Sequence, residues 1–249
     1  SVSLLTQSGQ EAAPTGRESH PISQLIETLR SANGPPAQAS ASSSVLFLIQ
    51  QLDESTVVLR FFSGAADLVI GGDAQGGVQV SGAVNGQDFD AISLSGVENL
   101  TIETAGESDR ITLLLDQLAS VAARGIFLHS GAGDDRLILV GESAPALPRL
   151  DWDGGVGADK LLGPAGDATW FITGQDAGSV SNLSFAGVEH LEGAADNQDT
   201  FVFSAAATLS GGIDGGRGGF DSLVIAGGSY ASIRFLGNGP DSGWVFLDD

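Results

Sequence analysis

The most informative segment of this chain is Gly154-Gly155-Val156-Gly157-Ala158-Asp159-Lys160-Leu161-Leu162. It fits the pattern Gly-Gly-x-Gly-x-Asp-x-U-x, in which U is a large apolar residue, at every specified position. The glycines permit a tight turn whose carbonyls face inward, because glycine adopts backbone conformations that other residues avoid. The aspartate supplies a carboxylate beside the turn, and Leu161 fills the core. The stretch therefore predicts one turn of a stacked β coil.

Two further stretches follow nearly the same sequence pattern. Ser130-Gly131-Ala132-Gly133-Asp134-Asp135-Arg136-Leu137-Ile138 differs at the first position, and Gly215-Gly216-Arg217-Gly218-Gly219-Phe220-Asp221-Ser222-Leu223 has one extra residue before its aspartate. One such motif is weak evidence, since glycine and aspartate are common in turns. Three copies with the same flanking pattern predict a stacked parallel β architecture.

A shorter word, Asp-x-apolar, recurs along most of the chain. It begins at Asp67, Asp90, Asp109, Asp135, Asp159, Asp199 and Asp221, at intervals of 23, 19, 26, 24, 40 and 22 residues. We interpret the longest interval as two periods with a degenerate member near Val180, which gives a period of about 22 residues. Such a period, with β runs between turns, is typical of a solenoid.

A longer repeat is superimposed on this one. Leu94-Ser95-Gly96-Val97-Glu98-Asn99-Leu100 matches Phe185-Ala186-Gly187-Val188-Glu189-His190-Leu191. The alignment predicts two diverged units, at about 60–141 and 162–227, within a solenoid that covers residues 45–249. The tail after residue 227 reads as the start of a third unit.

The first 44 residues have a different character. Residues 1–20 are polar and read as a flexible lead. Residues 21–33 predict a short amphipathic helix, with Pro21 suited to its first turn and apolar residues at helical spacing. Residues 34–44, rich in Pro, Ala and Ser, predict a linker.

Composition limits the classes of function. The chain has 36 Gly, no Cys, no Met and a net charge of −21. Without cysteine there is no disulfide framework, and so strong a negative charge argues against a nucleic-acid partner. No apolar run reaches the roughly 18 residues that a membrane span needs. The absence of methionine indicates a segment of a longer protein, so we expect neighbouring repeats of the parent chain as partners.

The glycine-aspartate nonapeptides resemble hemolysin-type (RTX) calcium-binding repeats. The Gly-Val-Glu-x-Leu word of residues 187–191 looks like the repeats of giant bacterial surface proteins and haemagglutinin-like adhesins. The resemblance covers residues 60–227 and implies secretion to the cell surface or medium, a right-handed parallel β-roll or β-helix, and folding assisted by calcium. By that resemblance the ligand aspartates are Asp135, Asp159 and Asp221, and the turn glycines are Gly131, Gly133, Gly154, Gly155, Gly157, Gly215, Gly216 and Gly218. Unlike consecutive RTX nonapeptides, each motif here stands alone.

Two interpretations of the aspartates stay open. Calcium needs six to eight oxygen ligands, of which one aspartate and a few turn carbonyls supply at most half, and the pair Asp135 and Asp159 is the best candidate for a shared ion. The alternative needs no ion, because aspartates also cap the N–H groups of turns.

For function, we expect an all-β, right-handed parallel β-solenoid with a short N-terminal helix. It would serve as a structural or adhesive module of a large secreted or cell-surface bacterial protein, with a surface glycan or a protein receptor as a further partner. The alternative is a carbohydrate-acting β-helix lyase or glycoside hydrolase. We expect no enzyme, because Lys160 occupies a variable motif position and His129 and His190 replace ordinary turn residues. A third interpretation, an Ig-like β-sandwich, predicts antiparallel strands.

Overall fold

The computed structural model describes residues 2–7, 45–62, 64–239 and 242–248. The predicted helix at 21–33 and the linker at 34–44 lie outside these ranges. Within them, strands account for nearly all of the regular structure, and the one helix is the four-residue α2 (Leu115–Leu118). The prediction of an all-β protein is confirmed.

The strands form two large sheets and a separate hairpin. The first sheet has the order β1 (Val2–Gln7), β2 (Val45–Gln51), β3 (Thr56–Phe61), β7 (Asn99–Glu103), β9 (Gly125–His129), β11 (Arg149–Asp153), β15 (Leu183–Ala186), β14 (Ala177–Val180), β13 (Thr169–Gly174), β17 (Thr200–Ser204) and β19 (Ser222–Ala226). The second has the order β18 (Gly212–Asp214), β16 (His190–Glu192), β12 (Lys160–Leu162), β10 (Arg136–Val140), β8 (Arg110–Leu114), β4 (Ala66–Gly72), β5 (Val78–Val84) and β6 (Gln87–Leu94). The hairpin pairs β20 (Ser232–Gly239) with β21 (Ser242–Asp248). We call the two sheets the first sheet and the second sheet.

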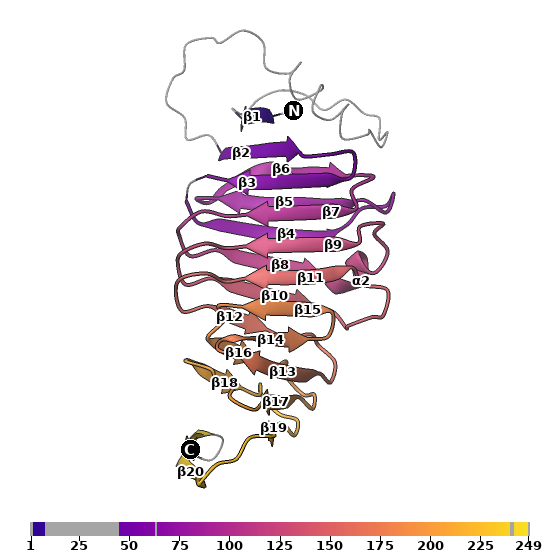
Figure 1. The fold of residues 1–249 in the computed structure, drawn as a ribbon. Helices are drawn as coiled ribbons and strands as arrows, with labels where there is room; N and C mark the ends of the chain where they lie inside the picture. The colour runs from indigo at the N-terminus through magenta and orange to yellow at the C-terminus, as the bar shows by residue number, and fades with distance from the viewer. Residues whose placement is uncertain (1, 8–44, 63, 240–241, 249) are drawn as a thin grey trace.

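From β7 to β12 the chain alternates strictly between the two sheets. Each strand then pairs in parallel with the strand that the chain made on its previous visit, so β7 lies beside β9 and β9 beside β11, while β8 lies beside β10 and β10 beside β12. The result is an elongated stack with the two ends of the chain at opposite ends (Figure 1). Parallel pairing of this kind excludes the Ig-like sandwich, whose strands are antiparallel.

Besides the antiparallel pairs β1–β2 and β2–β3 at the start of the first sheet, two antiparallel runs depart from the parallel pattern. In the second sheet, β4, β5 and β6 form consecutive antiparallel pairs, and β13, β14 and β15 do the same in the first sheet. The second run lies in the interval of 40 residues between Asp159 and Asp199. That interval therefore contains an inserted antiparallel meander, with Val180 at the end of β14, instead of the two equal periods that we inferred from the sequence.

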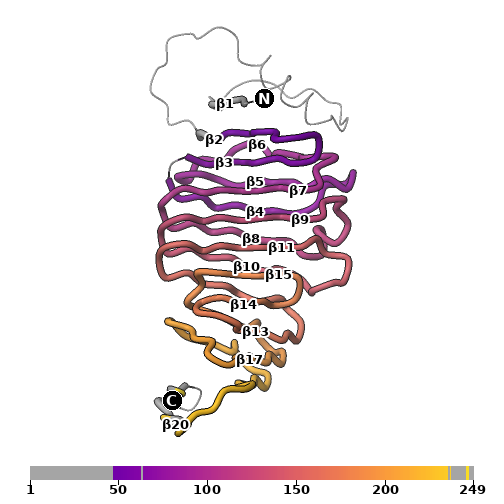
Figure 2. The backbone as a smooth tube through the Cα atoms, viewed as in Figure 1, coloured from indigo at the N-terminus to yellow at the C-terminus, as the bar shows by residue number. Residues whose placement is uncertain are grey.

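The two matching segments of the sequence occupy equivalent places but in opposite sheets. Residues 96–100 follow the meander of the second sheet and lead into β7 of the first. Residues 187–191 follow the meander of the first sheet and lead into β16 of the second. The same local order is thus repeated with the roles of the two sheets exchanged. Figure 2 shows the successive turns of the chain stacked along the molecule in the order of the sequence.

The core lies between the sheets and is built from register-matched apolar rows. In the second sheet one row runs through Leu68, Ile111, Leu137, Leu161 and Leu191, all of them buried. Four of these five are the apolar residue of an Asp-x-apolar or Glu-x-apolar word. Because side chains alternate between the faces of a strand, the acidic residue two positions earlier points to the same side as the apolar one. At Asp109, Asp135 and Asp159 the word therefore carries both side chains into the interior.

Candidate functional site

A ladder of carboxylates runs along the stack at the start of the strands of the second sheet. The backbone N–H of Ala66 donates to Asp109 Oδ1 over 2.6 Å, that of Asp109 to Asp135 Oδ1 over 2.7 Å, and that of Asp135 to Asp159 Oδ1 over 2.7 Å. The N–H of Asp159 donates in turn to Glu189 Oε2 over 2.7 Å. Every carboxylate thus accepts a hydrogen bond from the backbone of an earlier turn. We call Asp109, Asp135, Asp159 and Glu189 the carboxylate ladder.

The sequence motif explains how the ladder is built. Its members are separated by 26, 24 and 30 residues, which are the lengths of chain between successive strands of the second sheet. Asp135 and Asp159 lie directly before β10 and β12, which are neighbours in that sheet. The candidate pair inferred from sequence is therefore brought together by a direct hydrogen bond between backbone and side chain.

A shorter ladder of the same kind lies in the first sheet. Ala168 N–H donates to Asp199 Oδ1 over 2.9 Å, and Asp199 N–H donates to Asp221 Oδ1 over 2.9 Å. Ala66 with Asp109 and Ala168 with Asp199 are equivalent positions of the two repeat units. The structure therefore places Asp221, the third candidate ligand, on the other sheet from Asp135 and Asp159.

The ladder aspartates are deeply buried and carry raised pKa values. Asp135 is 2% exposed and Asp159 is 0% exposed, and the second oxygen of each carboxylate, Oδ2, is buried without a hydrogen-bond partner among the described residues. Burial is the main reason that the pKa of Asp135 rises to about 7 and that of Asp159 to about 6. Nearby carboxylates add to the rise, because a second negative charge disfavours ionisation. Burial likewise raises the pKa of Asp109 and Asp199.

The motif glycines make room for this arrangement. Gly131, Gly155 and Gly216, at the second motif position, share a φ of 95–96°, which L-residues other than glycine rarely adopt. A Cβ on Gly155 would overlap the carbonyl oxygen of Gly131 in the neighbouring turn. A Cβ on Gly154 would lie 2.6 Å from Asp159 Oδ2. The glycines thus serve close stacking of turns and leave space for the carboxylates.

The remaining predicted glycines have related positions. Gly133 and Gly218 have positive φ values of 131° and 80°. Gly157 abuts the carbonyl of Gly133, and Gly215 lies beside the Asp221 carboxylate of its own motif. The stacking is reinforced by reciprocal backbone hydrogen bonds, with Gly133 N–H donating to Val156 O over 2.9 Å and Val156 N–H donating to Gly131 O over 2.8 Å.

Some acidic words of the sequence do not take part in a ladder. Asp67 in β4 and Asp90 in β6 are exposed and lie in the antiparallel run. Conversely, sequence reasoning did not single out Glu189, although it sits two residues before the buried Leu191 as the aspartates sit before their apolar residues. That spacing was the available signal. Glutamate replaces aspartate where the interval lengthens to 30 residues.

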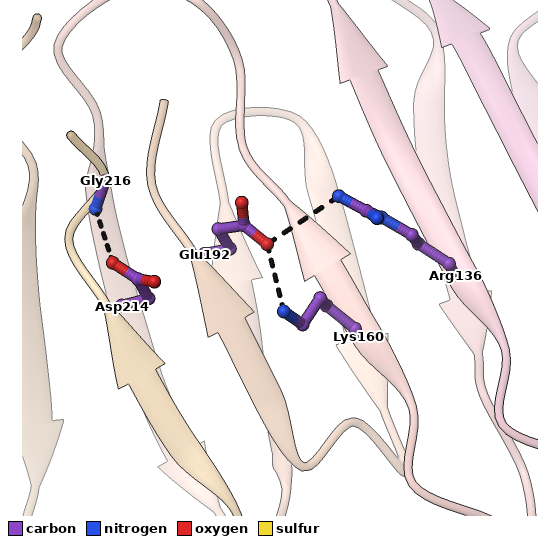
Figure 3. A network of polar contacts seen from close by, with 5 residues as sticks. All are labelled: Arg136, Lys160, Glu192, Asp214 and Gly216. Atoms are coloured by element: carbon purple, nitrogen blue, oxygen red, sulfur yellow. Dashed lines mark hydrogen bonds and ion pairs between the residues drawn. The ribbon is translucent and has the colours of Figure 1, made fainter. Parts of the chain in front are cut away.

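Basic side chains lie on the outer face of the second sheet. Arg110, Arg136, Lys160 and His190 are aligned by register on four neighbouring strands. Glu192 accepts a hydrogen bond from Lys160 Nζ over 3.0 Å and lies 3.7 Å from an Arg136 nitrogen, so it bridges two of these cations (Figure 3). Like charges on adjacent strands destabilise a sheet, and Glu192 offsets this. Lys160 thus has a structural partner.

The two central tryptophans have packing roles. Trp152 is buried and donates from Nε1 to Ser130 Oγ over 2.9 Å. Trp170 is fully buried and stacks on Phe201 with ring centroids 5.2 Å apart. Neither ring is available to stack on a sugar.

The described residues do not fit a closed calcium cage. No group of three or more His, Cys, Asp or Glu side chains within them could hold a metal ion. In Asp135 and Asp159, one carboxylate oxygen is already used by a backbone N–H group. Calcium binding therefore stays a prediction. The geometry accounts for the aspartates as acceptors for backbone groups.

Comparison with other proteins gives no further guide. In the part of the chain that the structure describes, no helix has the length and apolarity that a membrane crossing requires. No protein-family model, curated protein or solved structure matches this chain.

Proposed function

We propose that this chain is a structural repeat module, a parallel β-solenoid whose turns are joined by the carboxylate ladder. The observation that carries the proposal is the use of Asp109, Asp135 and Asp159 as buried acceptors for the backbone N–H groups of the preceding turn. A buried N–H group without an acceptor is costly. A side chain that satisfies it ties one turn to the next.

The ladder has a fixed direction. Each carboxylate accepts from a turn that is earlier in the chain, from Ala66 at one end to Glu189 at the other. Each added turn therefore satisfies a donor left by its predecessor and covers the apolar row beneath it. In repeat proteins of this kind, stability is approximately a sum of terms within repeats and between neighbours. Such a stack can serve as a stiff spacer.

The biological setting of the module follows from the sequence resemblance. We infer a segment of a large secreted or cell-surface bacterial protein with a structural or adhesive role, and a right-handed coil as is usual for parallel strands with crossover connections. The strongly acidic composition agrees with such a setting. Calcium would add stability if it bound at the turns, since a ligand that binds the folded state stabilises it.

The variant Asp159→Ala tests the proposal. It removes the acceptor of the Asp135 N–H group, which is worth about 1–3 kcal/mol of unfolding free energy when a buried donor loses its partner. Asp153→Ala, a change at a half-exposed residue on the outer face of β11, is the matched control. Urea unfolding is measured for both variants and the wild type, in excess calcium and in excess chelator.

The outcomes separate the two interpretations of the aspartates. A structural ladder predicts the same loss for Asp159→Ala in calcium and in chelator, and a small effect for Asp153→Ala. A loss that occurs only in calcium, together with stabilisation of the wild type by calcium, would identify Asp159 as a metal ligand. No loss in either condition would refute the ladder as the element that holds the stack together.

A further inference from the structure

Both sheets end at the same end of the stack. In the described part of the chain, β18 is the last strand of the second sheet and β19 the last strand of the first. Both edges are parallel strands whose outer backbone groups face away from their sheet neighbours. An open edge of this kind is a template for pairing with another strand.

The core rows remain uncovered at this end. In the first sheet, Trp170 and Phe201 are buried and stacked, but Leu223, the register partner of Phe201, is 49% exposed. In the second sheet, Leu191 is buried and its register partner Ile213 is only partly buried. The exposed positions continue the two apolar rows, and the chain after β19 forms the antiparallel hairpin of β20 and β21 and adds no further turn to the two sheets.

The shorter ladder specifies the polar part of that turn. Asp199 N–H is capped by Asp221 Oδ1, just as Ala168 N–H is capped by Asp199 Oδ1. Asp221 N–H is the next donor in the series, at an exposed position directly before β19. A partner that continues the series must place a carboxylate opposite this N–H group and an apolar side chain two residues later.

We propose that the end formed by β18 and β19 is a docking surface for one further β turn that carries an acidic residue two positions before an apolar one, paired in parallel with both edges. The proposal rests on the proposed function, because it treats the ladder as the rule by which turns are added. The partner is thus defined by a carboxylate for Asp221 N–H and by apolar side chains over Leu223 and Ile213.

The chain supplies its own probe. A synthetic peptide with the sequence of residues 188–204 contains β16, β17 and the word that begins at Asp199. Docked on the end of the stack, its copy of Leu191 would cover Ile213, its copy of Phe201 would cover Leu223, and its copy of Asp199 would accept from Asp221 N–H. Binding to the full chain is measured by fluorescence anisotropy of the labelled peptide.

Matched variants test both sides of the contact. In the peptide, Asp199→Ala removes the carboxylate. In the protein, Leu223→Asp places a charge at the docking edge, while Phe171→Asp changes a residue of similar exposure, 47%, on the outer face of β13 inside the sheet. Circular dichroism and thermal melting establish that both protein variants remain folded, as their exposure predicts.

The expected result is saturable binding that weakens about tenfold or more with Asp199→Ala and with Leu223→Asp, and changes less than about twofold with Phe171→Asp. Absence of binding, or equal weakening by the two protein variants, overturns the proposal. So does a dimer of the chain in sedimentation that Leu223→Asp abolishes, because a second copy would then occupy the end. Failure here while Asp159→Ala still destabilises the chain leaves the proposed function standing.

Discussion

The pH dependence of stability follows directly from the burial of Asp135. The pKa of this residue rises from its ordinary value of 3.8 to about 7, chiefly because the carboxyl is buried, with the charges of Asp109 and Asp159 adding to the rise. Between those two values the folded state binds more protons than the unfolded state. Stability therefore falls as the pH rises, by up to about 1.4 kcal/mol per pH unit for this group.

The magnitude can be worked out for a practical window. From pH 5 to pH 8, a window that spans the folded pKa of about 7, the contribution of Asp135 to the unfolding free energy falls by about 3 kcal/mol. The variant Asp135→Asn cannot ionise, so it lacks this contribution. As the pH rises from 5 to 8, the unfolding free energy of the wild type should therefore fall by that amount relative to the unfolding free energy of the variant.

Urea unfolding in excess chelator at several pH values measures this difference and removes any contribution of calcium. The subtraction cancels the titration of groups that the variant leaves unchanged. Asp88→Asn, a change at an exposed residue of β6, is the control and should show the same dependence of stability on pH as the wild type. A difference between wild type and Asp135→Asn that is flat from pH 5 to pH 8 would refute the argument that this carboxyl is buried without a compensating charge.

Three further predictions concern the stack itself. Gly155→Ala should lower the free energy of unfolding, measured in urea, by about 2 kcal/mol or more, because the residue has a φ of 96° and a Cβ there overlaps Gly131 O. The control is Gly106→Ala, where the nearest atom to a Cβ lies 3.8 Å away, and it should be tolerated in the same urea assay. Leu161→Ala should cost about 2–5 kcal/mol as a cavity in the core row, whereas Val156→Ala, at a largely exposed turn position, should change the urea midpoint little. Glu103→Gln removes the partner of Arg60 on the outer face of the first sheet. It should lower the free energy of unfolding by no more than about 1 kcal/mol, and by less in high salt. A larger loss that does not depend on salt would contradict the assignment of this ion pair to the surface.

Several features of the site could be read from the sequence because they are local. Asp-x-apolar needs only the alternation of side chains along a strand to place both residues on the same face. The second motif glycine needs only a turn that requires positive φ. For these reasons the motif alone pointed to Asp135, Asp159 and their turn glycines, and to a mostly β chain.

Other features depend on which strands become neighbours. Asp135 meets Asp159 across 24 residues, and Asp159 meets Glu189 across 30 residues, and no local pattern gives the register that joins them. The exchange of sheets between the two repeat units and the meander that contains Val180 likewise arise from the path of the chain.

Local sequence patterns are enough to predict that this chain is built from β strands and glycine turns, with an acidic and an apolar residue two positions apart at the start of many strands. What the acidic residues do depends on the tertiary structure. Their carboxylates face the backbone of the preceding turn, and burial between stacked turns, which separates them from water, raises the pKa values of Asp135 and Asp159. Burial is a property of the assembled stack, because it depends on residues that lie a whole turn away along the chain.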